Sequence, residues 1–172
     1  MARLLVVYYS LSGNTERIAK RLTYEYDAMR IVRLETKEPY SGSYDEIAVR
    51  GQREVESGFR PEIRPVDAYS SEEVTLDLDE FDYIAIGTPT RWYTYAPAVA
   101  AFLEMFDRND RTIIPFQTHC GRKGHVMADL KKACGGAVLR NKLDVQFDST
   151  GGNTLITPKS EIDKWIKSFN NI

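Results

Sequence analysis

The feature that most constrains this fold is a series of short, mostly apolar runs separated by amphipathic segments. Three such runs, Leu4–Tyr9, Phe81–Gly87 and Thr112–Thr118, have the length of β-strands and are followed by small or turn-forming residues. A strand that is apolar along its length is typical of a parallel sheet, where both faces are buried. The segments that begin near Asn14 and Ala96 have apolar residues at helical spacing. The alternation therefore predicts a parallel sheet with helices on both faces and right-handed crossovers.

Two further strands and two further helices complete the prediction. The strands are Met29–Leu34 and Gly136–Phe147, and the second of them is expected to be bent. One helix covers roughly Lys123 to Cys134, and the last helix begins with Thr157 as its cap and Pro158 as its first residue. The chain of 172 residues is thus expected to form one doubly wound α/β domain, residues 1–172.

An insertion at about residues 37–78 interrupts the alternation. The stretch from Ser43 to Glu46, "SYDE", fits a capping box, which predicts a helix to about Ser57. Pro61 and Pro65 then favour extended chain. Two interpretations stay open for this insertion. It forms a lid or partner surface beside a ligand site, or it supplies a helix that covers one face of the sheet.

Composition and charge exclude several classes of protein. The net charge of −2 argues against nucleic-acid binding, which needs a concentrated basic face. No apolar run approaches about 18 residues, so no membrane insertion is expected. The two cysteines, Cys120 and Cys134, form no CxxC pair, and the N-terminus shows no signal-peptide pattern. A reducing, cytoplasmic location is therefore expected.

The first of three unusual loops, Ser10–Thr15, has the features of a phosphate site. In an open parallel sheet, ligands bind at the carboxyl ends of the strands, where this loop lies. The following helix offers unpaired N–H groups, Gly13 allows close approach, and three hydroxyls and an amide add donors. The loop has no lysine, which favours a monophosphate ester over a triphosphate. The alternative is that Ser12 or Asn14 only caps the helix.

The second and third loops lie at the same edge of the predicted sheet. The second, Thr88–Tyr95, carries Trp92, Tyr93 and Tyr95, which can cover a flat apolar ring or pack on neighbouring segments. The third, His119–Gly124, contains two glycines that can present backbone N–H groups to the edge of such a ring, or form an ordinary turn. Cys120 in this loop is expected to have a lowered pKa, because helix N-termini stabilise thiolates.

Three motifs in these loops resemble a known family. "SLSGNT" resembles the flavodoxin phosphate loop, (S/T)-x-(S/T)-G-N-T, at every specified position. "IGTPTRWYTYAPAVAAFLE" is similar to the second flavin loop and following helix of small flavodoxin-like proteins. "IPFQTHCGRKG" is similar to their third loop. The motifs come in family order and cover most of the chain outside the insertion.

The resemblance implies a five-stranded parallel sheet of order 2-1-3-4-5 and non-covalent FMN. The residues implied for the ribityl phosphate loop are Ser10, Leu11, Ser12, Gly13, Asn14 and Thr15. Those implied to line the isoalloxazine are Thr88, Pro89, Thr90, Arg91, Trp92 and Tyr93. Those implied for the other wall are Thr118, His119, Cys120, Gly121 and Gly124. No side chain is assigned a catalytic role, and no metal site is expected.

The implied function is electron transfer through FMN with a redox partner protein or a small-molecule electron donor or acceptor. The chain lacks the strong acidity of shuttle flavodoxins, which leaves room for an FMN-dependent NAD(P)H- or quinone-type reductase. Arg91, a cation in the flavin loop, is expected to raise the potential of the flavin. Two further alternatives are a Cys–His hydrolase that uses Cys120 with His119 or His125, and a cofactor-free binding module built on the insertion.

Overall fold

The central part of the sheet has the expected strand order. The computed structural model describes residues 2–28 and 30–172. Its central strand β1 (Leu4–Tyr8) lies between β2 (Arg30–Thr36) and β4 (Tyr83–Arg91) and is parallel to both. Strand β6 (Thr112–His119) follows on the far side of β4, again in parallel. The expected second strand begins at Met29, which lies outside the described residues.

The fifth parallel strand is bent, as the sequence predicts. It is divided into β7 (Val138–Leu139), which pairs with the beginning of β6, and β8 (Leu143–Gln146), which pairs with its end. Between the two, Asn141 adopts a positive φ of 51°, a conformation that asparagine tolerates better than most residues. The order 2-1-3-4-5 of the parallel strands is thereby confirmed.

The sheet is not wholly parallel, and this corrects the prediction. Strand β3 (Ile63–Asp67), from the insertion, pairs antiparallel with β2 at the edge of the sheet, and β5 (Thr94–Tyr95) pairs antiparallel with β4. The segment of β3, "IRPVD", alternates polar and apolar residues and contains Pro65. An edge strand tolerates proline because only one side of it takes part in the ladder. Its composition therefore gives a weaker strand signal than the buried parallel strands do.

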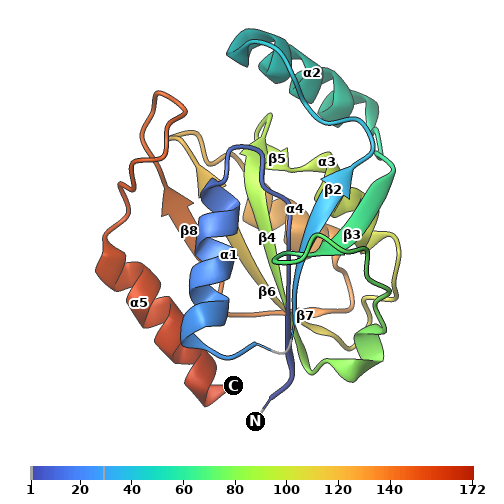
Figure 1. Cartoon of the computed structure of the whole chain (residues 1–172), viewed down its shortest axis with the longest axis vertical. Coiled ribbons are helices and arrows are strands. Elements are labelled where there is room, and N and C mark those ends of the chain that lie inside the picture. Colours follow the sequence, from blue (N-terminus) through green and yellow to red (C-terminus); the bar gives the residue numbers. More distant parts are fainter. Residues whose placement is uncertain (1, 29) are drawn as a thin grey trace.

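Helices cover both faces of the sheet (Figure 1). On one face lie α1 (Asn14–Glu25) and α5 (Lys159–Ser168), and on the other lie α3 (Pro97–Leu103) and α4 (Val126–Ala133). Side chains of the first strand alternate between the two cores: Leu4, Val6 and Tyr8 face α1 and α5, whereas Leu5, Val7 and Tyr9 face α3 and α4. Two short 3-10 helices are η1 (Leu78–Glu80) and η2 (Phe169–Asn171).

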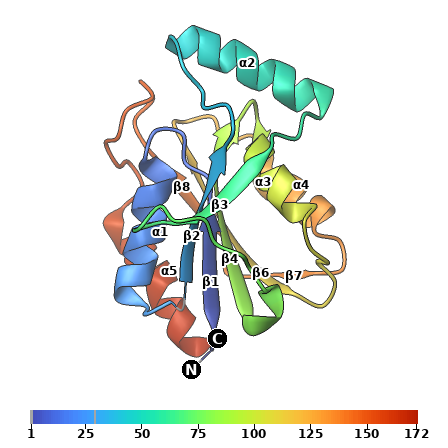
Figure 2. The ribbon, with the colours of Figure 1, turned by 45° about the vertical axis from the view of Figure 1, so that its right-hand side comes forward.

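The insertion forms helix α2 (Tyr44–Ser57) at the end of the sheet where the strands terminate. The predicted capping box is present: the Ser43 hydroxyl accepts from the Glu46 N–H at 3.2 Å, and the Glu46 carboxylate accepts from the Ser43 N–H at 3.1 Å. Both views show α2 beyond the carboxyl ends of the strands and not on a face of the sheet (Figures 1 and 2). The insertion therefore does not supply a helix that covers the sheet.

The start of the last helix differs from the prediction by one residue. Pro158 is the N-cap of α5, and the helix begins at Lys159. Thr157, expected as the cap, instead accepts a hydrogen bond from the Gln146 N–H at 2.7 Å and ties this segment to β8. Among the helices of the described residues, none has the length and apolar character needed to cross a membrane.

Candidate functional site

The first loop leaves backbone donors open at the start of α1. Gly13, with φ of 95°, is the N-cap of α1, and no side chain caps it. Neither Ser12 nor Asn14 therefore serves as the helix cap, which was the alternative interpretation of the loop. The Ser10 hydroxyl accepts from the N–H groups of Gly13 at 3.1 Å and Glu16 at 3.2 Å, which closes the loop. In the described chain, the N–H groups of Asn14 and Thr15 remain without a partner and point out of the helix end.

Two side chains of this loop are used inside the protein. The Asn14 amide donates to the Gly152 carbonyl at 3.0 Å, and the Thr15 hydroxyl is 2.7 Å from that of Thr118. Both residues are buried. Only one of the two hydroxyl groups donates its proton in the Thr15–Thr118 contact, so the proton of the other hydroxyl is not used in it. These side chains join the first loop to the third and to a fourth segment, Asp148–Thr154.

Sequence reasoning missed this fourth segment. The carboxylate of Asp148 accepts from the N–H groups of Gly152 at 3.2 Å and Thr154 at 2.7 Å, which folds "DSTGGNT" into a tight loop. A hydrogen bond from the Thr150 hydroxyl, together with these backbone bonds, holds the pKa of Asp148 below its ordinary value. The cluster of Gly, Ser, Thr and Asn after the fifth strand is the signal that could have indicated it.

The second loop is a two-residue β-hairpin with aromatic side chains at its tip. Thr90 pairs with Tyr95 and Arg91 with Thr94, so Trp92 and Tyr93 form the turn. Both have positive φ, 44° and 70°, in a kind of turn that favours Asn-Gly and strains bulky residues. Their rings are about 40% exposed and meet edge to face at 5.4 Å.

Neighbouring segments hold this strained turn in place. The His125 N–H donates to the Tyr93 carbonyl at 2.8 Å, and the Thr94 hydroxyl donates to Asp129 at 2.5 Å. A Cβ on Gly124 would collide with the Tyr93 backbone. Gly124, which the resemblance assigns to the ring wall, thus lets the third loop approach the hairpin closely.

Other residues assigned to the second loop are engaged locally. The buried Thr88 hydroxyl accepts from the Ala96 N–H at 2.9 Å and donates to the Pro89 carbonyl at 2.8 Å. The Thr90 hydroxyl faces the Lys123 carbonyl at 3.5 Å. These bonds fix the route of the chain into and out of the hairpin.

The third loop is organised by His119, whose side chain is only 7% exposed. His119 Nδ1 accepts from the Gly121 N–H at 3.0 Å, and its Nε2 donates to Asp144 at 3.0 Å. Burial alone would raise the pKa of Asp144, but hydrogen bonds from His119 and Gln117 bring it below its ordinary value. The Gly121 N–H is therefore already bonded within the loop, which favours the ordinary turn over the alternative that this glycine presents its N–H group to a ligand.

Cys120 does not have the expected lowered pKa. Burial and the nearby Asp148 carboxylate raise the pKa of its thiol. Helix α4 begins only at Val126, so no helix N-terminus directly follows the cysteine. In the described part of the chain, His119 bonds to Asp144 and His125 to Asp129, and neither bonds to Cys120. The raised thiol pKa and the absence of a described Cys120–histidine bond argue against the alternative that the protein is a Cys–His hydrolase.

Arg91 anchors α2 to the hairpin. Its side chain is buried, and the guanidinium lies 4.5 Å from the centre of the Tyr40 ring and donates to the Ile47 carbonyl at 3.1 Å. Arg50 also stacks on Tyr40, at 4.2 Å. A Cβ on Gly51 would run into the Arg91 guanidinium, so the glycine permits the helix to lie this close. No described carboxylate forms an ion pair with Arg91.

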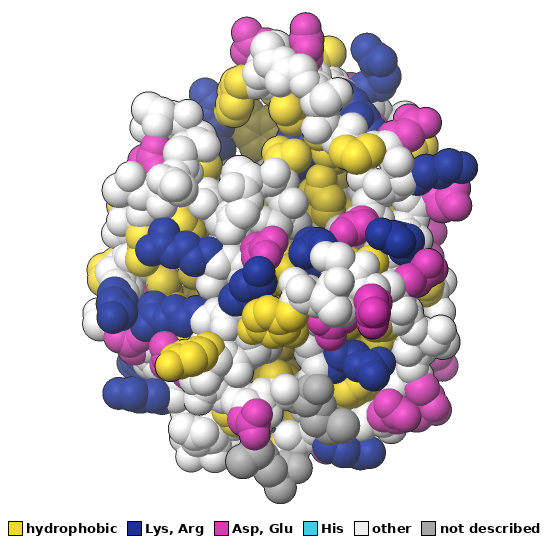
Figure 3. Space-filling model, viewed as in Figure 1, with side chains coloured by type: hydrophobic (Ala, Val, Ile, Leu, Met, Phe, Trp, Pro, Cys, Tyr) yellow, Lys and Arg dark blue, Asp and Glu magenta, His cyan; other side chains and the backbone are white. Residues whose placement is uncertain are grey.

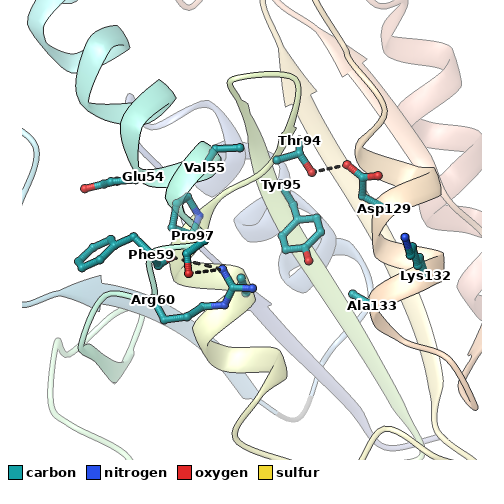
Figure 4. A pocket seen from close by; sticks show the side chains of 12 residues that line it. Glu54, Val55, Phe59, Arg60, Thr94, Tyr95, Pro97, Asp129, Lys132 and Ala133 are labelled. Atoms are coloured by element: carbon teal, nitrogen blue, oxygen red, sulfur yellow. Dashed lines mark hydrogen bonds between the residues drawn. The ribbon is translucent and has the colours of Figure 1, made fainter.

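The other end of α2 reaches the fourth segment. The largely exposed Tyr44 ring lies near Gly151, where a Cβ on the glycine would be 3.4 Å from the ring. Figure 3 shows that the surface is hollowed beneath α2, with hydrophobic side chains at the bottom of the hollow. Helix α2 therefore lies across the carboxyl edge of the sheet. Arg91 anchors it at β4, and Tyr44 at its start lies near the 148–154 segment. A separate cavity lies behind the hairpin, between α2, α3 and α4 (Figure 4).

We expect the hairpin strain to be measurable as lost stability. Replacing the turn by Trp92→Asn with Tyr93→Gly should raise the free energy of unfolding of the apoprotein by about 1 kcal/mol, because a left-handed bulky residue costs roughly 1–3 kcal/mol and the lost ring pair offsets part of this gain. Urea denaturation measures it. Tyr93→Phe keeps the backbone strain and should leave stability unchanged, and a double variant no more stable than this control would contradict the strain argument.

We also expect Arg91 to hold α2 in place. Arg91→Met removes a desolvated cation–π contact and a charged hydrogen bond, and relief of the buried charge offsets part of this loss, which leaves a net cost of about 2 kcal/mol. Amide hydrogen exchange in α2 should then become roughly thirtyfold faster, while exchange in β1 stays slow. The matched control is Arg53→Met, on the exposed side of the same helix. Equal exchange of α2 in both variants would show that Arg91 is not its anchor.

Comparison with known proteins places this geometry in a recognised group. A family model described as Flavodoxin matches residues 3–167. No curated protein matches the chain. Among solved structures, a flavoprotein from Lactobacillus acidophilus in complex with FMN is 18% identical, with a TM-score of 0.72 over 96% of this chain and 99% of that one.

Two further structures show the same architecture. A protein described as a flavoprotein from Bacteroides uniformis is 23% identical, with a TM-score of 0.74 over 96% of this chain and 98% of that one. A flavodoxin, WrbA-like protein from Agrobacterium tumefaciens is 15% identical, with a TM-score of 0.56 over 96% of this chain and 91% of that one. These likenesses concern the fold.

Proposed function

Because the chain belongs to the flavodoxin family, we propose that it binds FMN non-covalently at the three loops of the carboxyl edge and transfers electrons through it. The observation that carries this proposal is the first loop. It has open N–H groups at the start of α1, hydroxyl donors and no cation. That donor set suits a monophosphate ester at a helix N-terminus.

The phosphate end of FMN fits the first loop. Gly13 has no heavy atom within 4 Å of the position that a Cβ would take, so space is open beside it. The Ser12 side chain is exposed, with no partner for its hydroxyl in the part of the chain that the structure describes. In the proposed complex, Ser12 and the N–H groups of Asn14 and Thr15 donate to the phosphate, while Ser10 keeps the loop closed.

The ring end of FMN fits the hairpin. Trp92 and Tyr93 present partly exposed aromatic surface at the tip, and a hollow with an apolar bottom lies beneath α2 (Figure 3). We propose that one of these two rings stacks on the isoalloxazine. FMN, when bound, supplies the electron chemistry. The chain contributes binding, orientation and the charge of Arg91, which lowers the free energy of a negative charge held near the hairpin.

The position of α2 favours a second, narrower function, that of an FMN-dependent reductase of small molecules. The helix has 14 residues and is therefore about 21 Å long. It lies across the edge at which the ring would be reached. A protein partner needs broad contact with that edge, whereas a nicotinamide or a quinone needs only a gap beside the helix. The modest net charge of −2 also gives little electrostatic attraction to a basic protein partner.

Phosphate recognition is tested by comparing FMN with riboflavin. We expect FMN to bind at least about a hundredfold more tightly, because two or more charged hydrogen bonds of roughly 1.5–3 kcal/mol depend on its phosphate. Ser12→Ala should weaken FMN about tenfold or more and leave riboflavin unchanged. Ser160→Ala, on the exposed start of α5, is the control. The affinities are measured by fluorescence titration. Equal affinities for FMN and riboflavin would contradict the proposal.

The choice between small-molecule and protein acceptors is tested with the reduced, FMN-loaded protein. We expect stopped-flow oxidation by a small quinone to be faster than oxidation by cytochrome c. Arg91→Met, which loosens α2, should reduce the difference between the oxidation rates with quinone and with cytochrome c. Arg53→Met should leave this difference unchanged. If the unmodified protein is oxidised faster by cytochrome c than by the quinone, electron transfer to a protein partner would be favoured.

A further inference from the structure

A cavity of about 460 Å³ lies behind the β4–β5 hairpin. Its walls come from the C-terminal part of α2, from β5, from α3 and from one side of α4 (Figure 4). This volume lies in the range of small-molecule pockets, about 300–1,000 Å³. Of the three loops at the carboxyl edge, only the second contributes, through Thr94 and Tyr95 at its end, and neither Trp92 nor Tyr93 lines the cavity. The cavity is therefore distinct from the proposed FMN site, from which the hairpin separates it.

Three side chains that line this cavity, Tyr95, Arg60 and Lys132, carry hydrogen-bond donors. Figure 4 shows the Tyr95 ring between Arg60 on one side and Lys132 on the other. The Tyr95 hydroxyl has no hydrogen-bond partner in residues 2–28 and 30–172, and the Lys132 ammonium forms no ion pair there. Burial raises the pKa of Tyr95, while the charge of Arg60 opposes this. The phenol is therefore protonated at neutral pH and available as a donor.

Arg60 is held in position by its own contacts. Its Nε donates to Glu104 at 2.8 Å, and its Nη1 donates to the carbonyls of Gly58 and Phe59, both at 3.3 Å. These bonds leave Nη2 for a ligand. A guanidinium fixed in this way loses little further freedom when it binds an anion.

The acidic groups of the wall already have partners. Asp129 is bonded to the Thr94 hydroxyl and to His125. Glu54 is bonded to Arg50 and to the Tyr40 hydroxyl. The donors that remain open to the cavity are therefore the Tyr95 hydroxyl, the Lys132 ammonium and Nη2 of Arg60, whose charge is shared with Glu104. This donor set is complementary to a single anion.

The rest of the wall is apolar and partly flat. Besides the face of Tyr95, it is formed by Val55, Pro97, Ala100 and Ala133. A ring packs well against such a surface, because aromatic and proline faces give broad contact without polar groups to desolvate. We propose that this cavity is a second ligand site, which binds a small aromatic carboxylate. The carboxylate contacts the Tyr95 hydroxyl, Lys132 and Arg60, and the ring lies on the apolar wall.

The test is calorimetric titration with 2-naphthoate as the probe, on the protein with FMN and without it. We expect saturable binding to one site in both forms, since none of the residues proposed to contact FMN lines the cavity. Lys132→Met should weaken binding about tenfold and Tyr95→Phe severalfold, because each removes a donor to the charged group. The matched control is Lys131→Met, the neighbouring lysine on α4, which does not line the cavity. Uncharged 2-naphthamide should bind at least tenfold more weakly.

Several results would overturn the proposal. These are no saturable binding at millimolar probe, competition between the probe and FMN, equal weakening by Lys131→Met and Lys132→Met, or equal affinity for the neutral amide. Ala100→Trp, which fills the cavity, should abolish binding, and undiminished binding by this variant would also count against the site. If the tryptophan variant does not fold, the surface variant Lys132→Met still decides the question. Because the probe is also tested without FMN, failure of this site is distinguishable from failure of FMN binding.

Discussion

Burial of the parallel strands on both faces is the constraint on which the rest of the structure depends. All five residues of β1 are fully buried, with helices on either side. No side chain in the middle of such a sheet is available to a ligand, so binding is confined to the loops at its edges. Because β1, β4 and β6 are adjacent and parallel, their loops meet at one edge, where the Thr15–Thr118 contact joins the first to the third.

The hairpin at this edge shows how local strain is supported by tertiary contacts. Trp92 and Tyr93 adopt a conformation that suits Asn-Gly, and the bonds from His125 and Thr94 hold the turn in it. Strain of this kind persists where surrounding structure over-determines the backbone, and it is concentrated at functional sites. The same hairpin has a different environment on each side, an open edge of the sheet and a walled cavity. One hairpin thus borders both of the proposed binding surfaces.

Helix α2 links access to the site with its electrostatics. Arg91 is both the anchor of the helix and a buried positive charge without a carboxylate partner in the described chain. Moving α2 away would expose this guanidinium to water, which would screen its charge and weaken its field at the hairpin. The position of the helix and the strength of that field are therefore coupled. The sequence had indicated a cation in the ring loop but not its burial.

The sequence by itself determined the features that depend on residues close together in the chain. Strand and helix periods, the capping box at Ser43 and the three loops are all patterns within about ten residues, because local propensity and burial act over that range. Tertiary structure alone decided where distant segments meet. The Asn14–Gly152 bond joins residues 138 positions apart, and the Arg91–Ile47 bond joins residues 44 apart. Edge strand β3, the placement of α2 and the packing of Gly124 on Tyr93 depend on such contacts, which exist only once the chain has folded and which leave no periodic pattern in the sequence.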